Sequence, residues 1–298
     1  MRMFLAIALT TTGVFAIAPS FATPSDPTIV AVGDIARYVN GPQTETARLA
    51  TALAPREVLL LGDLAYTKGS DGEFRDKFAA NWGTVASAFT TIAVPGNHEY
   101  GTNNAGGYRH AATTYHFPTT GSDLWSVTRI GTWTVIGLDS EGIGASTSRL
   151  NPKGKREIAF LKNALATNAG RPTIVMWHRP RYSNGQHGNQ SDVGVKQLWK
   201  TSVADSDVKL VLWGHDHDFE PVTRSIAATT STPAHSVLSM TIGTGGAEPY
   251  TCTGAHCLTG KYGVVKLTLH SSSVDWQFRA VSTTKSTGTI LKSGTFGW

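Results

Sequence analysis

The chain lacks low-complexity segments, internal repeats and interdomain linkers, and beyond residue 22 it lacks any apolar run long enough to cross a bilayer. The absence of a linker or repeat argues against several domains. With 298 residues, of which 40% are hydrophobic and 16% charged, the composition is that of an ordinary globular protein. We therefore expect residues 23–298 to form a single domain.

A clustered basic surface is also missing. The formal net charge is +5, but the Lys and Arg residues are dispersed, and only Lys153–Arg156 forms a local cluster. Dispersed charge does not predict a specific nucleic-acid site. A mildly positive surface would still attract small anions.

Only two cysteines are present, Cys252 and Cys257. In an oxidising compartment we expect them to form a disulfide. The alternatives are two free thiols, or soft metal ligands that would lack the two further partners that a zinc site needs.

Residues 1–22 have the pattern of a secretory signal peptide. Arg2 precedes an apolar segment, Met3–Ala18, and Ser20–Ala22 places small residues at the two positions that a signal peptidase reads. A retained anchor would need about 18–20 uninterrupted apolar residues, and Thr10–Gly13 interrupts this segment. We expect cleavage after residue 22, a secreted or periplasmic mature chain, and no membrane association afterwards.

Apolar runs alternate with helical periodicities, which predicts an α/β (α+β) fold: two mixed sheets packed together, with helices outside, as a four-layer α/β/β/α sandwich. Strands are expected at Thr28–Val32, Val58–Leu61, Thr91–Val94, Leu124–Arg129, Thr132–Leu138, Thr173–Trp177, Lys209–Trp213, Val264–Leu269 and Val274–Phe278. Helices are expected at Gln43–Leu53, Phe74–Phe89, Pro152–Ala166 and Val193–Ser202. Gly101–Tyr115 is rich in Gly, Asn and Thr, which predicts a surface loop or lid.

Polar side chains of metal-ligand type follow five of these strands, where an open α/β sheet holds its ligands. They are Asp34, Asp63 with Tyr66, Asn97 with His98, His178, and His215 with His217. Any one of them could be structural, because Gly-Asp is an ordinary turn and a lone His is more often a hydrogen-bonded structural residue. Together these oxygen and nitrogen donors suit two transition-metal ions better than one. Asp63 is our choice for the carboxylate that would bridge ions about 3.5–4 Å apart.

The order of these motifs resembles that of the calcineurin-like metallophosphoesterases. The carrying residues are Asp34, Gly62-Asp63-x-x-Tyr66, Gly96-Asn97-His98-Glu99, His178 and Gly214-His215-x-His217. Ala36 stands where much of the superfamily has a metal-binding histidine, and Tyr66 narrows the resemblance to the purple acid phosphatase branch, as a short form with the catalytic domain only. Alanine instead of the usual glycine at position 36 is a small departure from that branch.

The resemblance implies a metallophosphatase-like fold, two metal ions, and hydrolysis of a small phosphate monoester by in-line attack of a metal-bound hydroxide. The first ion, expected to be Fe(III), would be held by Asp34, Asp63, Tyr66 and His217. The second, Fe, Zn or Mn, would be held by Asp63, Asn97, His178 and His215. We expect a monomer that binds no nucleic acid specifically.

Three further residues receive catalytic roles from the resemblance. His98 would bind the phosphoryl oxygen or protonate the leaving alkoxide, oriented by Glu99. His187, on a Gly/Asn-rich loop, resembles the second catalytic histidine of the family.

Arg179 and Arg181 could contact phosphate, although outward surface arginines are commoner. Asp139 could be a neighbour of the site or purely structural.

Two other interpretations remain open. A phosphodiesterase or nucleotidase could use the same dimetal core, with Gly101–Tyr115 as a specificity wall, and its preference for a diester over a monoester would identify it. A secreted metal-binding or adhesive protein with a dead site is the second alternative, and measurable hydrolysis by a metal-replete preparation would exclude it.

Overall fold

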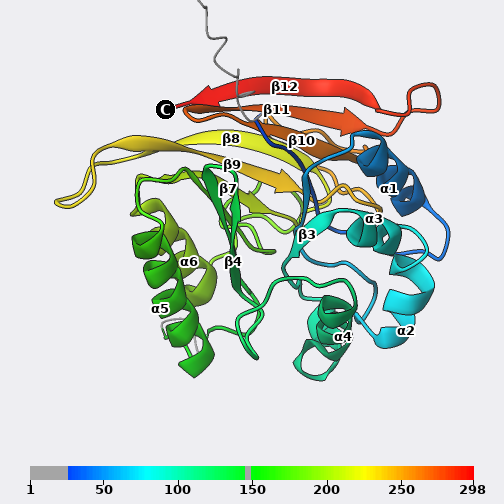
Figure 1. The fold of residues 1–298 in the computed structure, drawn as a ribbon, viewed down its shortest axis with the longest axis horizontal. Coiled ribbons are helices and arrows are strands. Elements are labelled where there is room, and N and C mark those ends of the chain that lie inside the picture. The colour runs from blue at the N-terminus through cyan, green and yellow to red at the C-terminus, as the bar shows by residue number, and fades with distance from the viewer. Residues whose placement is uncertain (1–25, 145–148) are drawn as a thin grey trace, which may run out of the picture.

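Two six-stranded mixed sheets form the centre of the computed structural model, which describes residues 26–144 and 149–298 (Figure 1). The first has the order β12-β11-β10-β1-β2-β3, and the second β4-β5-β6-β7-β9-β8. Strands β1 to β3 are parallel, as are β5, β6, β7 and β9, and the other neighbours pair antiparallel. The strand bounds of the first sheet are β1 Thr28–Val32, β2 Glu57–Leu60, β3 Thr90–Ala93, β10 Gly263–Leu269, β11 Ser273–Ala280 and β12 Thr289–Gly297. Those of the second are β4 Ser126–Ile130, β5 Trp133–Gly137, β6 Thr173–Met176, β7 Val208–Trp213, β8 Phe219–Ile226 and β9 His235–Ile242.

Helices cover the outer faces of both sheets, so the predicted α/β architecture is confirmed. The helices beside the first sheet are α1 Pro42–Ala52, α2 Asp71–Glu73, a π-helical turn Phe74–Phe78, α3 Trp82–Ala88 and α4 Gly106–Thr114. Those beside the second are α5 Pro152–Thr167 and α6 Val193–Val203. None of the helices in the described part of the chain is both long and apolar enough to cross a membrane. The expected signal peptide lies outside the described residues.

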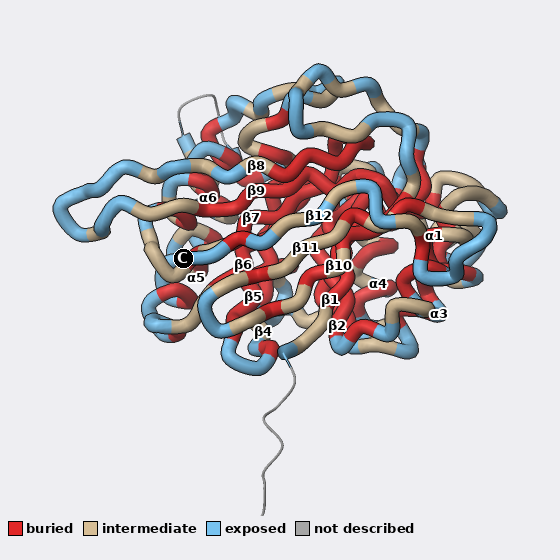
Figure 2. Tube along the Cα trace, turned by 90° about the horizontal axis from the view of Figure 1, so that it is seen from above, coloured by how far each residue is buried: buried red, intermediate tan, exposed pale blue. Residues whose placement is uncertain are grey.

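Three hydrophobic clusters fill the three interfaces of this sandwich. Along β1, Ile29 belongs to the cluster between the sheets and Val30 to the cluster under α1, α3 and α4. A third cluster joins the second sheet to α5 and α6. Because side chains alternate between the faces of a strand, a strand buried on both faces must be apolar throughout. This explains why the central strands were recognisable as continuous apolar runs, and Figure 2 shows them buried along most of their length.

The prediction of a loop at Gly101–Tyr115 is wrong. Most of this segment is helical, with a short 3-10 turn, Asn103–Ala105, leading into α4. Tyr108, Ala111 and Ala112 bury one face of α4 in the hydrophobic cluster beside the first sheet, where α4 contacts α2 and the π-helical turn. Gly107 allows the close approach, since a Cβ there would lie 2.1 Å from the carbonyl oxygen of Gly69. Tertiary packing therefore overrides the weak helix propensity of the segment.

Two other differences concern helix and strand bounds. The helix expected over Phe74–Phe89 is broken near Asn81, whose side chain accepts from the backbone of Trp82 and begins α3. Strands β8, β9 and β12 were not among the predicted strands. The predicted disulfide is confirmed, with Cys252 bonded to Cys257.

Candidate metal centre

The predicted site residues follow the carboxyl ends of parallel strands in both sheets. Asp34, Asp63 and Asn97 come after β1, β2 and β3 of the first sheet, whereas His178 and His215 come after β6 and β7 of the second. Backbone hydrogen bonds continue past the strand ends: Asp34 N donates to Gly62 O at 3.0 Å, and Gly214 N donates to His178 O at 3.0 Å. His215 N also donates to Asp34 Oδ2 at 2.8 Å, so the strand ends of the two sheets meet at the site.

The backbone at this edge is locally strained. Asp34, Asp63 and His215 have φ values of 60°, 51° and 73°, a region that non-glycine residues rarely adopt. Space is equally restricted, because a Cβ on Gly96 would lie 2.2 Å from Asp63 Oδ1. The short turns thus hold the side chains in one place.

One group of donors surrounds Tyr66. Its hydroxyl donates to Asp34 Oδ1 at 3.0 Å and lies 3.2 Å from His217 Nε2, which is 3.4 Å from the same Asp34 oxygen. His217 Nδ1 donates to the carbonyl of Glu248 at 2.6 Å, so Nε2 faces the group. Burial and the negative charges of Asp34 and Asp63 raise the pKa of Tyr66 well above its usual value. A phenolate here therefore requires a cation.

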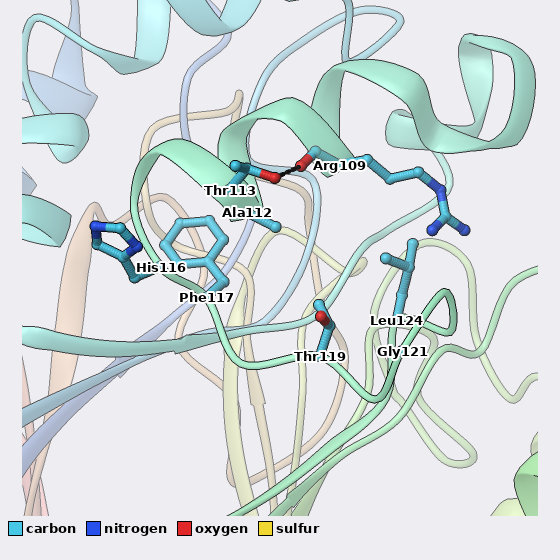
Figure 3. Close-up of a pocket in the computed structure, with 8 residues that line it drawn as sticks. All are labelled: Arg109, Ala112, Thr113, His116, Phe117, Thr119, Gly121 and Leu124. Atoms are coloured by element: carbon cyan, nitrogen blue, oxygen red, sulfur yellow. Dashed lines mark hydrogen bonds between the residues drawn. The ribbon is translucent and has the colours of Figure 1, made fainter.

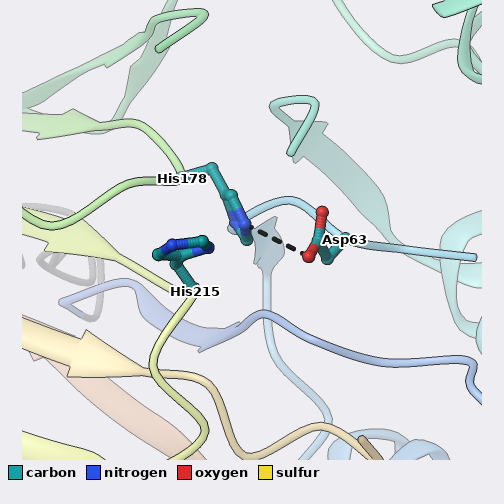
Figure 4. A group of neighbouring side chains, drawn as sticks. All are labelled: Asp63, His178 and His215. Carbon is teal, nitrogen blue, oxygen red and sulfur yellow. Dashed lines mark ion pairs between the residues drawn. The ribbon is translucent and has the colours of Figure 1, made fainter. Parts of the chain in front are cut away.

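A second group of donors adjoins the first at Asp63. His178 Nε2 lies 3.3 Å from Asp63 Oδ2 and 3.2 Å from Asn97 Oδ1, while its Nδ1 donates to the carbonyl of Leu61 at 2.8 Å. Single nitrogen or oxygen atoms of Asp63, His178 and His215 all lie within 4.8 Å of one another (Figure 4). Burial opposes a charge on His178, but the Asp63 carboxylate outweighs it and raises the pKa of His178 to about 10. Burial and the neighbouring side chains of His178, Arg179 and His187 lower the pKa of His215.

The chemistry and spacing of both groups fit transition-metal ions. Carboxylate, imidazole, amide and phenol donors suit such ions, and protein nitrogen and oxygen ligands bind at about 2.0–2.2 Å. Neighbouring ligands of one ion are therefore about 2.8–3.6 Å apart by octahedral or tetrahedral geometry, a range that includes the donor separations of 3.0–3.4 Å given above. The structure thus brings together all seven residues predicted as metal ligands: Asp34, Asp63, Tyr66, Asn97, His178, His215 and His217.

Two more predicted histidines lie beside these groups. His98 Nδ1 donates to the carbonyl of Thr67 at 2.6 Å, and its Nε2 is 3.8 Å from Asp63 Oδ2. The ring of His187 stacks on that of His215, with centroids 4.3 Å apart. His98 is partly exposed, so its Nε2 can meet a ligand that enters from solvent.

Glu99 does not orient His98 as we expected, because the Thr67 carbonyl holds that ring. The buried Glu99 carboxylate instead accepts hydrogen bonds from four backbone amides. These belong to Asp63 at 2.9 Å, Leu64 at 2.9 Å, Ala65 at 3.2 Å and Gly96 at 2.7 Å. Glu99 therefore shapes the two turns that carry Asp63 and Asn97.

Two contributors were not predicted from the sequence. Glu248 supplies the carbonyl that fixes His217, and the ring of Tyr250 stacks on His217 with centroids 3.9 Å apart. Both follow β9, in a segment without a metal-ligand motif, and only the nearby Cys252–Cys257 pair distinguished it. Asp139, whose role was left open, is buried and pairs with Lys153 Nζ at 2.7 Å, a structural arrangement.

A separate cavity of about 370 Å³ lies between α4 and the segment that leads to β4 (Figure 3). Arg109 lines it, but its guanidinium donates to the backbone carbonyls of Asn104 and Ser122. None of the residues that line this cavity belongs to the donor groups. It therefore adds nothing to the metal centre.

Comparisons with known proteins agree with this geometry. The family model for calcineurin-like phosphoesterases matches residues 27–219. Two curated sequences, both named as uncharacterised proteins of Mycobacterium tuberculosis, are 28% identical over 203 residues, or 61% of this chain and 38% of theirs. The chain thus spans less than half the length of these relatives.

Solved structures share the fold at low sequence identity. Purple acid phosphatase PPD1 from yellow lupin (Lupinus luteus) has a TM-score of 0.69 and 19% identity, covering 92% of this chain and 54% of its own. GAP50, described as the anchor in the inner membrane complex of Plasmodium, has a TM-score of 0.66 and 14% identity, covering 92% and 89%. A dimetal phosphatase from Danio rerio has a TM-score of 0.58 and 12% identity, covering 92% and 99%. With the family match extending over most of the chain, including every predicted metal ligand, this protein belongs to the calcineurin-like phosphoesterase family.

Proposed function

We propose that this chain is an exported dinuclear-metal phosphatase that hydrolyses phosphate monoesters in the manner of purple acid phosphatases. The observation that carries the proposal is the pair of adjacent donor groups that meet at Asp63, with Tyr66 in one of them. The secretory pattern of residues 1–22 and the disulfide support export. The fold alone does not decide catalysis, because a protein described as an anchor shares it.

In this proposal the two donor groups hold different ions. Asp34, Tyr66 and His217 supply negative charge and one imidazole, which suits Fe(III), whereas Asn97 and the unprotonated imidazoles of His178 and His215 are neutral donors that suit divalent Fe, Zn or Mn. Bound there, the ions would lower the pKa of a water molecule to near neutrality and offset the negative charge of the substrate. The carbonyls of Leu61 and Glu248 keep the Nε2 atoms of His178 and His217 available as ligands.

The phenylalanine variant Tyr66→Phe tests the iron assignment. A phenolate bound to Fe(III) gives a purple charge-transfer band, so we expect the purified wild-type protein to be coloured and the variant to lose that band. Metal analysis and a visible spectrum measure both. Tyr250→Phe is the matched control, because Tyr250 stacks on His217 but lies outside the donor groups. Colour that survives in Tyr66→Phe would contradict the assignment of Tyr66 as an iron ligand. A colourless, active, manganese-loaded wild type would favour the calcineurin-like family as a whole over its purple acid phosphatase branch.

The position of His98 predicts a leaving-group effect. Since Nδ1 donates to the Thr67 carbonyl, Nε2 is the nitrogen that faces the substrate, and in the imidazolium form it carries the proton that a leaving alkoxide needs. We expect His98→Ala to lower kcat for an alkyl phosphate about 10²- to 10⁴-fold, and to affect p-nitrophenyl phosphate much less because its leaving group needs no proton. His110→Ala, an exposed histidine on α4, is the control. Equal losses on both substrates would contradict an acid role for His98.

The diesterase or nucleotidase alternative uses the same donor groups. Its proposed specificity wall is a packed helix rather than a mobile loop, because α4 occupies most of Gly101–Tyr115. Relative kcat/KM for p-nitrophenyl phosphate and bis(p-nitrophenyl) phosphate decides between the two reactions. Absence of hydrolysis of either ester by the metal-loaded protein would leave the metal-binding alternative.

A further inference from the structure

Arg179 lies beside the donor groups and has no role in the proposed function so far. It follows His178 directly after β6, and its backbone amide donates to Ser140 Oγ at 3.1 Å. Its Nη1 lies 3.2 Å from Nε2 of His215. The side chain is 28% exposed, so part of it reaches solvent beside the centre.

Glu141 holds this guanidinium in a fixed orientation. Its Oε1 accepts from Arg179 Nε at 2.8 Å, and the Glu141 side chain is only 9% exposed. Glu141 is itself fixed, because its amide donates to Asp139 Oδ1 at 3.0 Å and Lys153 Nζ donates to its carbonyl at 2.9 Å. A guanidinium has five N–H donors: the ion pair uses the one on Nε and the contact with His215 uses one on Nη1, which leaves three on the terminal nitrogens.

Neighbouring arginines do not share this arrangement. The guanidinium of Arg181 lies over the ring of Tyr182 at 4.3 Å, and its Nη1 donates to the carbonyl of Gln190 at 3.2 Å. Arg37 lies 5.8 Å from the ring centroid of Tyr66, on the side of the first donor group. Arg179 is therefore the arginine beside the second donor group whose terminal nitrogens can face a bound anion.

We propose that Arg179, oriented by Glu141, forms an anion subsite that binds the non-reacting oxygens of the substrate phosphoryl group on the His215 side. A planar guanidinium matches two oxygens of a phosphate, and charge strengthens both hydrogen bonds. A monoester presents a dianionic phosphoryl group with three terminal oxygens, whereas a diester presents a monoanion with two. The subsite therefore favours monoesters over diesters. This inference rests on the proposed function and names the residue that sets its substrate class.

The test compares Arg179→Gln and Arg179→Lys with Arg181→Gln in the metal-loaded protein. Calorimetry measures the Kd of inorganic phosphate, and kinetics measure kcat/KM for p-nitrophenyl phosphate and bis(p-nitrophenyl) phosphate. For Arg179→Gln we expect phosphate binding and monoester kcat/KM to weaken about 10- to 100-fold, the usual size for a charge-assisted hydrogen bond, with a much smaller change for the diester. Arg179→Lys should lose less, because it keeps the charge, and Arg181→Gln should match the wild type.

An unchanged phosphate Kd in Arg179→Gln, or equal losses on monoester and diester, would overturn the subsite. Because Arg179→Gln leaves the buried Glu141 without its partner, the double variant Glu141→Gln/Arg179→Gln removes both charges and provides the same comparison if the single variant does not fold. Wild-type protein that hydrolyses neither ester would contradict the proposed function, and calorimetry with phosphate would still decide the role of Arg179.

Discussion

Replacing Asp63 by asparagine is expected to lower phosphatase activity about 10³-fold or more, because the variant loses the carboxylate shared by both donor groups and with it the activation of water by two ions. Asparagine has nearly the same shape, and its amide oxygen can still accept from the backbone of His98. The fold should therefore persist while the bound metal falls below two ions per chain. Enzyme kinetics and metal analysis on the same preparation measure the two effects.

Asp76→Asn is the matched control for this variant. Asp76 is exposed, lies on the π-helical turn and pairs with the neighbouring Arg75, so activity and metal content should stay at wild-type levels. Circular dichroism confirms that Asp63→Asn is folded. A folded Asp63→Asn protein that keeps both ions and most of its activity would contradict the bridging role.

Replacing Glu99 by alanine is expected to have the largest effect on stability. The variant leaves the buried amides of Asp63, Leu64, Ala65 and Gly96 without the carboxylate that accepts from them. Each unsatisfied buried group costs about 1–3 kcal/mol, and entry of water recovers part of this, so we expect a loss of about 3 kcal/mol or more. Urea unfolding monitored by circular dichroism measures it. Activity should fall as well, because the turn at Asp63 loses its support.

Two further variants make this prediction specific to Glu99. Glu99→Gln keeps one acceptor oxygen and should lose less stability than Glu99→Ala. Glu45→Ala removes an exposed carboxylate that pairs with Arg48 on α1, for which a change of about 0–1 kcal/mol is usual. A Glu99→Ala protein as stable as Glu45→Ala would show that water replaces the carboxylate fully.

The donor groups were predictable because their residues follow strands that are buried on both faces. Such strands must be continuous apolar runs, and the Gly-Asp and Gly-His steps after them mark where the chain turns. Asp63 and His215 could therefore each be assigned to the carboxyl end of a buried strand without knowledge of the helices. Parallel pairing then places the strand ends together, whatever the lengths of the connections between them.

The remaining contributions come from contacts that carry no local pattern. Glu248 acts through its backbone carbonyl, which any residue could supply, and Tyr250 acts through ring stacking in a loop. The role of Glu99 was misjudged for a related reason. We expected Glu99 to orient His98 because the two residues are adjacent in the sequence. The Glu99 carboxylate instead accepts from the backbone of the turns that follow β2 and β3. Helix α4 was missed because burial of Tyr108, rather than local propensity, makes it helical.

Because the donors come from both sheets, metal ions bound at the centre would affect the stability of the fold as well as hydrolysis. Asp34, Asp63 and Asn97 belong to the first third of the chain, and His178 and His215 to a later part that packs against it through a separate sheet. Cations that bind both sets cross-link the halves of the sandwich at one end and bind the folded state in preference to the unfolded one. Metal supply would then set how long the protein resists heat and proteases, independently of turnover.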